Sequence, residues 1–267
     1  CEFFTEDDRI TGFSVSVHSR YAEAGADIVV FAEFATSGTP AYGLLTKTTF
    51  LTLCEEAVES IASKCRGIAA IIGTPYLTAE GPISAAAYID PEGNIEYIGK
   101  RHVTARREMG YIVGSSIGSH SIRLHGEVLN VVVGDDLSHI DDIDDDMDAI
   151  LPVNARRYGK GILTRRFDKV SHMAFSEGKT LVMVNQVGGS GDIVYDGTSG
   201  VLNSEGQLTM LLKSFEEDKN MVIKNGRYGA YIAYKGKNYR LPNGRKVENL
   251  NYEDCKQIVE TQKKSKK

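Results

Sequence analysis

Three predicted strands of this chain lead into positions where side-chain chemistry is expected. Glu33 follows one apolar run, Lys100 directly follows another predicted strand, and Gly134 follows a third, just before two aspartates. A carboxylate can transfer protons, and a lysine ammonium group can stabilise an oxyanion. Gly134 has no side chain and cannot act as a nucleophile. The chain therefore has two of the groups that acyl transfer needs. It lacks the third group, the nucleophile, at Gly134 after the third strand.

Longer motifs surround these positions. In chain order they are Gly-Ala-Asp before an apolar strand at 25–34, Ser-Gly-Thr-Pro at 37–40, Gly-Lys-Arg-His at 99–102, the apolar run into Gly-Asp-Asp-Leu at 129–137, Asn-Ala at 154–155, and Asn-Gln-Val-Gly-Gly followed by Asp-Ile-Val-Tyr-Asp-Gly-Thr-Ser at 185–199. Together they resemble the nitrilase (carbon–nitrogen hydrolase) superfamily, specifically the glutaminase domain of glutamine-dependent NAD synthetase. The resemblance covers about residues 20 to 218.

The resemblance implies roles for particular residues. Glu33 falls on the general base, Lys100 on the oxyanion-holding lysine, Gly134 on the position of the cysteine nucleophile, and Glu108 on a residue that braces the lysine. It also implies glutamine or a small amide as ligand. The substrate-binding positions that it implies are Tyr111, Lys160, Arg165, Asp192, Asp196 and Ser199. The related motif has serine where this chain has Arg156.

Because glycine cannot form an acyl-enzyme, we expect a catalytically inactive relative of amide hydrolases. An active carbon–nitrogen hydrolase with another nucleophile is the enzyme alternative. Ser138 is the nearest hydroxyl, but its use would require backbone movement of several ångströms. Without its neighbouring motif, Glu33 would be interpreted as an ordinary surface glutamate at a strand end, and with that motif we favour the active-site position. His102 is interpreted as an ordinary loop histidine.

The apolar patterns predict an α/β fold. Strands are expected at 27–36, 68–73, 84–90, 94–99, 120–124, 128–133, 149–153, 180–185 and 199–203, and helices at 17–24, 46–66 and 161–177. The resemblance implies a four-layer α-β-β-α sandwich over residues 1–218 that can pair into a homo-oligomer. The family's first strand has no clear counterpart before residue 20, and we expect no ATP-binding synthetase domain.

The charge distribution predicts a second unit. Residues 219–267 carry thirteen Lys and Arg against four Asp and Glu, whereas the rest carries eighteen against thirty-two. Residues 221–262 resemble the C-terminal repeat of bacterial type I DNA topoisomerases, through Gly-Arg-Tyr-Gly-Ala-Tyr at 226–231 and a later Leu-Pro. We expect a small basic β-rich module at 219–262 and a basic tail at 263–267.

Cations interleaved with tyrosines can neutralise phosphates while the rings stack on unpaired bases. Single-stranded DNA is therefore a second predicted partner, and an ordinary β-meander with amphipathic tyrosines is the alternative. The predicted binding residues are Lys224, Arg227, Tyr228, Tyr231, Tyr234, Lys235, Lys237, Tyr239 and Arg240.

Other features favour a cytoplasmic protein without cofactor or metal. The four cysteines are scattered, the acidic start does not resemble a signal peptide, and no apolar run could span a bilayer. The glycines at 188–191 do not match a phosphate-binding loop, and the acidic run at 141–148 lacks the glycine and glutamate of an EF-hand. A degenerate chain without a selected activity is a third interpretation.

Overall fold

The computed structural model describes residues 25–64, 66–103, 111–142, 146–190, 193–212, 221–226, 229–234, 237–242 and 258–262. The chain divides into two compact units, Glu2–Phe215 and Glu216–Lys267. Each unit has its own hydrophobic cluster.

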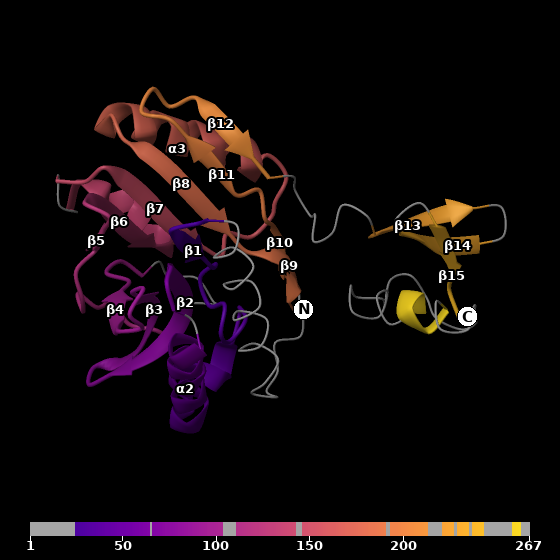
Figure 1. Cartoon of the computed structure of the whole chain (residues 1–267), viewed down its shortest axis with the longest axis horizontal. Helices are drawn as coiled ribbons and strands as arrows, with labels where there is room; N and C mark the ends of the chain where they lie inside the picture. Colours follow the sequence, from indigo (N-terminus) through magenta and orange to yellow (C-terminus); the bar gives the residue numbers. More distant parts are fainter. Residues whose placement is uncertain are drawn as a thin grey trace. The chain divides into compact units, whose positions relative to one another are not determined.

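The first sheet of the larger unit has four strands (Figure 1). In spatial order they are β1 (Ile28–Val30), β2 (Ala69–Thr78), β3 (Gly81–Ile89) and β4 (Ile95–Gly99). The β1–β2 pair is parallel, whereas β2–β3 and β3–β4 are antiparallel. β2 and β3 are buried over most of their length, which explains why both contain long apolar runs without strict alternation.

The second sheet has six strands. In spatial order they are β12 (Leu208–Leu211), β11 (Gly200–Leu202), β8 (Thr180–Asn185), β7 (Ala149–Asn154), β6 (Glu127–Val133) and β5 (Ser121–Leu124). β6, β7 and β8 are parallel neighbours, so their carboxyl ends lie at one edge of the sheet. The remaining pairs are antiparallel.

One helix packs on the outer face of each sheet (Figure 1). α2 (Thr48–Lys64) buries apolar residues at helical spacing, including Val58 and Ile61, against the first sheet. α3 (Ile162–Glu177) packs on the second sheet and ends at Gly178, whose left-handed conformation caps the helix. A third apolar cluster lies between the sheets. These layers confirm the predicted α-β-β-α sandwich.

The elements agree with most predicted ranges, with three differences. The strand expected at 27–36 is short, because the chain leaves the ladder after β1 and turns at Phe34, which has a φ of 59°. The glycine-rich motif forms a hairpin of β9 (Val187–Ser190) and β10 (Ile193–Asp196). The exposed strand β12 was not expected. The helix expected at 17–24 lies outside the described residues.

Two shorter elements complete the larger unit. A 3-10 turn, η1, covers Tyr42–Thr46 before α2, and a second, η3, covers Gly134–Asp142 after β6. The acidic segment after β6 therefore curls back immediately, which keeps Gly134 and the two following aspartates buried at the strand end.

The smaller unit is an antiparallel meander of β13 (Met221–Gly226), β14 (Gly229–Tyr234) and β15 (Lys237–Arg240). Its described residues at 258–262 are helical. Ile232 and Tyr239 from the sheet pack with Ile258 and Val259 from this helical segment. The unit therefore has a core in which the helix covers part of the sheet.

Candidate functional site

Glu33, Lys100 and Gly134 lie together at strand ends of both sheets. Lys100 directly follows β4, Gly134 directly follows β6, and Glu33 lies in the turn after β1. The Nζ atom of Lys100 is 3.1 Å from Oε1 of Glu33, and the Ser84 hydroxyl donates a hydrogen bond of 2.8 Å to the same oxygen. The Lys100 and Glu33 side chains are 0% and 2% exposed. The acid and the cation thus form a buried ion pair.

Gly134 lies directly against this ion pair. A Cβ atom built on Gly134 would be 2.6 Å from Nζ of Lys100 and 2.8 and 2.9 Å from the two carboxylate oxygens of Glu33. The φ of Gly134 is +55°, in the left-handed region that residues with a side chain rarely adopt. A side chain at this position would therefore point at the acid and the cation, and both would have to shift to admit it.

Asp135 and Arg156 extend the network, and sequence reasoning did not assign either of them to the site. Asp135 Oδ2 is 3.3 Å from Lys100 Nζ, and its Oδ1 is 2.7 Å from Nη1 of Arg156. Nη2 of Arg156 donates a hydrogen bond of 2.9 Å to the Gly134 carbonyl. Two carboxylates and two cations are thus in direct contact. The sequence signal that could have identified Asp135 was the acidic pair directly after a buried strand.

Asp136 joins the Lys100 strand end to the turn at Gly134. Its carboxylate accepts hydrogen bonds from the backbone N–H groups of Arg101 (2.8 Å) and His102 (2.6 Å). Its Oδ1 also lies 3.1 Å from Nδ1 of His102, whose ring stacks on His139 with centroids 3.9 Å apart. Asp136 and His139 thus hold the His102 side chain next to the site.

Ser138 is exposed, whereas Glu33 and Lys100 are buried. Nζ of Lys169 in α3 donates a hydrogen bond of 2.7 Å to the Ser138 hydroxyl. Burial lowers the pKa of Lys169, and the nearby Arg156 lowers it further. This arrangement gives Ser138 a partner other than the general-base candidate.

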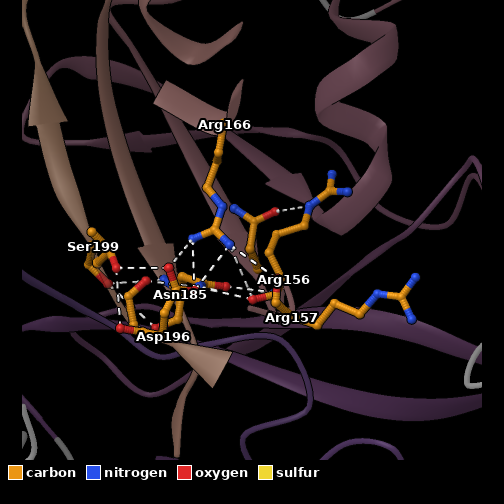
Figure 2. Close-up of polar contacts among 9 residues, drawn as sticks. Arg156, Arg157, Arg166, Asn185, Asp196 and Ser199 are labelled. Atoms are coloured by element: carbon orange, nitrogen blue, oxygen red, sulfur yellow. Dashed lines mark hydrogen bonds and ion pairs between the residues drawn. The ribbon is translucent and has the colours of Figure 1, made fainter. Parts of the chain in front are cut away.

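Two predicted substrate-binding residues, Asp196 and Ser199, lie in a buried polar network (Figure 2). Nη1 of Arg166 contacts both carboxylate oxygens of Asp196, at 3.1 and 3.2 Å. The Asn185 side chain donates to the Asp196 carboxylate and to the Gly197 carbonyl, and the Asn185 backbone N–H donates to the Ser199 hydroxyl. These residues fix the loop after β10 through protein contacts.

The other predicted substrate-binding residues that the structure describes are exposed, unlike the buried ion pairs. Tyr111 is 42% exposed, and Lys160 and Arg165 are also exposed. Nε of Arg165 donates to the carbonyl of Gly161, the N-cap residue of α3. Glu108 and Asp192 lie outside the described residues.

The predicted nucleic-acid-binding residues differ in exposure. Tyr239 is 4% exposed and belongs to the small core, whereas Lys237 and Arg240 are exposed and Tyr231 and Tyr234 are partly buried. In the strand register, Lys224 pairs with Tyr231, and Tyr231 pairs with Arg240. The Lys224 side chain and the residues Arg227, Tyr228 and Lys235 lie outside the part of the chain that the structure describes.

Within the described ranges, no three His, Cys, Asp or Glu side chains are grouped as a metal site. Part of the acidic run at 141–148 falls outside those ranges. No described helix has the length and apolarity needed to cross a membrane.

The two sheets, their outer helices and the converging carboxylate and lysine define a nitrilase-type sandwich, and comparison with solved structures agrees. The match to a mutant of the amidase from Nesterenkonia AN1, of the nitrilase superfamily, has a TM-score of 0.67 and 17% identity, and covers 97% of this chain and 92% of that chain. The match to glutamine-dependent NAD+ synthetase from Acinetobacter baumannii has a TM-score of 0.72 and 24% identity, and covers 79% of this chain and 41% of that chain.

Sequence comparison makes the similarity more specific. The chain is 28% identical over 204 residues to the glutamine-dependent NAD(+) synthetase of Xylella fastidiosa, which covers 73% of this chain and 37% of the relative. The chain thus spans a little over a third of that relative's length, and it resembles the nitrilase-fold glutaminase part. The family model described as topoisomerase C-terminal repeat matches residues 214–267.

Proposed function

We propose that the larger unit is a catalytically inactive relative of nitrilase-fold glutaminases, which retains the acid and the cation but lacks the nucleophile. The observation that carries the proposal is Gly134 lying directly against Glu33 and Lys100. Acyl transfer requires an atom that attacks the amide carbonyl and then leaves, and glycine provides none. Glutamine or a small amide is the ligand class that the similarity suggests.

The ion pairs support this proposal. Lys100 is shared between Glu33 and Asp135, at 3.1 and 3.3 Å, so both carboxylates compete for the charge that would stabilise an oxyanion. An amide ligand would have to displace one of these contacts. We therefore expect any amide binding to be weak and to lead to no turnover.

The test is ammonia release by the purified full chain from glutamine, butyramide and acrylamide, with an active glutaminase assayed in parallel. We expect no release above the buffer blank over a wide pH range. Release that is abolished by Glu33→Gln and by Ser138→Ala would contradict the proposal and identify a hydrolase with a different nucleophile. Release that survives Glu33→Gln would indicate a contaminating enzyme. The assay repeated with a preparation free of that enzyme would then decide between an inactive domain and a hydrolase with a different nucleophile.

As a second candidate function, we infer that the smaller unit binds single-stranded DNA. The register places Tyr231 between Lys224 and Arg240 on neighbouring strands, and the chain from residue 219 on is strongly basic. A tyrosine ring can stack on an unpaired base while flanking cations neutralise phosphates. Tyr239 is excluded from stacking because it is buried in the core.

Fluorescence anisotropy with a labelled single-stranded oligonucleotide tests this inference. Two phosphate contacts predict a loss of affinity of about sevenfold between 50 and 200 mM salt. We expect Tyr231→Ala and Arg240→Ala to weaken binding, and Arg123→Ala, an exposed arginine of the larger unit, to leave it unchanged. Absence of binding at about 50 mM salt would refute the inference, because a phosphate-driven interaction is stronger at lower salt.

A further inference from the structure

Arg156 makes closely spaced contacts beside Gly134, the position of the missing nucleophile. Its Nη2 donates to the Gly134 carbonyl at 2.9 Å, its Nη1 is 2.7 Å from Asp135 Oδ1, and its Nε donates to Asn154 Oδ1 at 3.3 Å. The backbone N–H of Arg156 donates to Asn185 Oδ1 at 2.7 Å. The guanidinium group is therefore hydrogen-bonded at both ends of its planar fork. Because this fork is rigid, little conformational entropy is lost for each hydrogen bond formed.

The exposure of the side chains places Arg156 at the outer side of the ion-pair network. Lys100, Glu33 and Asp135 are 0%, 2% and 4% exposed, whereas the Arg156 side chain is 26% exposed. Arg156 is thus the one member of these four that reaches solvent. A molecule that approaches Gly134 from the side of Arg156 meets the guanidinium group first.

The neighbouring arginines have different roles. Figure 2 shows that the Arg166 side chain points to Asp196, whereas the Arg156 and Arg157 side chains leave the backbone in different directions. Arg157 is exposed, its carbonyl accepts a hydrogen bond from Arg166, and its backbone forms an isolated bridge with Tyr195. Arg157 thus offers a matched control, with the same side chain one residue away.

We propose that Arg156 is a plug that closes the inherited site. The site then has two defects: it lacks a nucleophile at Gly134, and Arg156 blocks access to that position. The inference rests on the proposed function, since it assumes that the space beside Gly134 descends from an amide-binding site. It follows that a nucleophile restored at position 134 would remain shielded while Arg156 is present, and that a small residue at position 156 would open the path.

Alkylation of a cysteine introduced at position 134 separates shielding from charge. Iodoacetamide reacts with a thiolate, which forms an S–C bond as iodide leaves. A nearby guanidinium group favours the thiolate and would accelerate this reaction. A plug slows the reaction, because the reagent must reach the sulfur. Removing Arg156 therefore slows alkylation if its charge activates the thiol, and accelerates alkylation if its side chain shields the sulfur.

The experiment compares three full-length variants: Gly134→Cys, Gly134→Cys/Arg156→Ser and Gly134→Cys/Arg157→Ser. Peptide mass spectrometry follows alkylation at position 134 separately from the four native cysteines. We expect at least tenfold faster alkylation with Arg156→Ser, and a change within twofold with Arg157→Ser. An equal or slower rate with Arg156→Ser would overturn the proposal.

A second measurement remains if the cysteine variants do not fold. Arg156→Ser and Arg157→Ser are made in the otherwise unchanged chain, and hydrogen exchange is followed in the peptide that spans 129–137. We expect at least fivefold faster exchange with Arg156→Ser only, and unchanged exchange would overturn the plug. Ammonia release by the unchanged chain tests the proposed function, so failure of one proposal is distinguishable from failure of the other.

Discussion

Replacing Lys100 by methionine tests whether the buried ion pairs stabilise the fold. Methionine has a similar length but no charge, so the substitution leaves the volume nearly filled. It removes the cation that lies 3.1 Å from Glu33 and 3.3 Å from Asp135. Arg156 still pairs with Asp135, whereas the Glu33 carboxylate keeps the hydrogen bond from the Ser84 hydroxyl but loses its cation.

The expected loss of stability is large. Removing one partner of a buried ion pair costs about 3–5 kcal/mol, because the other charge stays buried without compensation. This is a large part of the roughly 5–15 kcal/mol by which typical domains are stable. Replacing both partners, in Glu33→Gln/Lys100→Met, removes the uncompensated charge. We therefore expect the double variant to recover about 1–3 kcal/mol relative to Lys100→Met.

Urea unfolding followed by far-ultraviolet circular dichroism measures these free energies. Lys47→Met is the control, because Lys47 is exposed, and we expect it to lie within about 0.5 kcal/mol of the unchanged chain. A loss below about 1 kcal/mol for Lys100→Met would refute the reasoning about uncompensated charge. A double variant that is no more stable than Lys100→Met would refute the coupling between the two side chains.

Three further predictions follow from single positions. Gly134→Ala should lose at least about 1 kcal/mol more than Gly178→Ala in urea unfolding, because both residues are left-handed but an added Cβ meets other atoms only at Gly134; equal losses would contradict the crowding. Burial lowers the pKa of His120 from 6.5, so the unfolded chain binds more protons and stability falls as pH decreases below 6.5. The stability advantage over His120→Asn, measured by urea unfolding at several pH values, should therefore shrink toward acidic pH, and a constant advantage would contradict a neutral buried imidazole. Tyr239→Ala should destabilise the smaller unit by about 3–5 kcal/mol, whereas Tyr231→Ala should cost less than about 1 kcal/mol, as judged by hydrogen exchange at 221–226; similar effects would contradict their different burial.

Local patterns predicted most of the framework. The apolar runs that became β6, β7 and β8 were placed within one residue of their observed ends, because central strands are apolar on both faces. The helical spacing at 46–66 predicted α2, which covers Thr48–Lys64. Elements with weak patterns were missed. The β9–β10 hairpin begins in a glycine-rich motif, and all four residues of β12 are exposed, so neither shows the alternation of a half-buried strand.

The motifs also predicted which positions could form the site. Glu33, Lys100 and Gly134 were assigned from sequence contexts, although up to a hundred residues separate them. Their convergence depends on two sheets packing face to face, which no local pattern encodes. Which of these side chains contact one another, and whether they are buried, follows from that packing.

The amino-acid sequence by itself determined that a glycine stands where a nucleophile is expected, and that a basic segment follows an acidic one. Only the tertiary structure decided that Lys100 is shared between two carboxylates and that Arg156 contacts the Gly134 carbonyl. The physical reason is that strand and helix patterns depend on neighbours a few residues away, whereas the pairing of buried charges depends on side chains that meet only when the layers assemble.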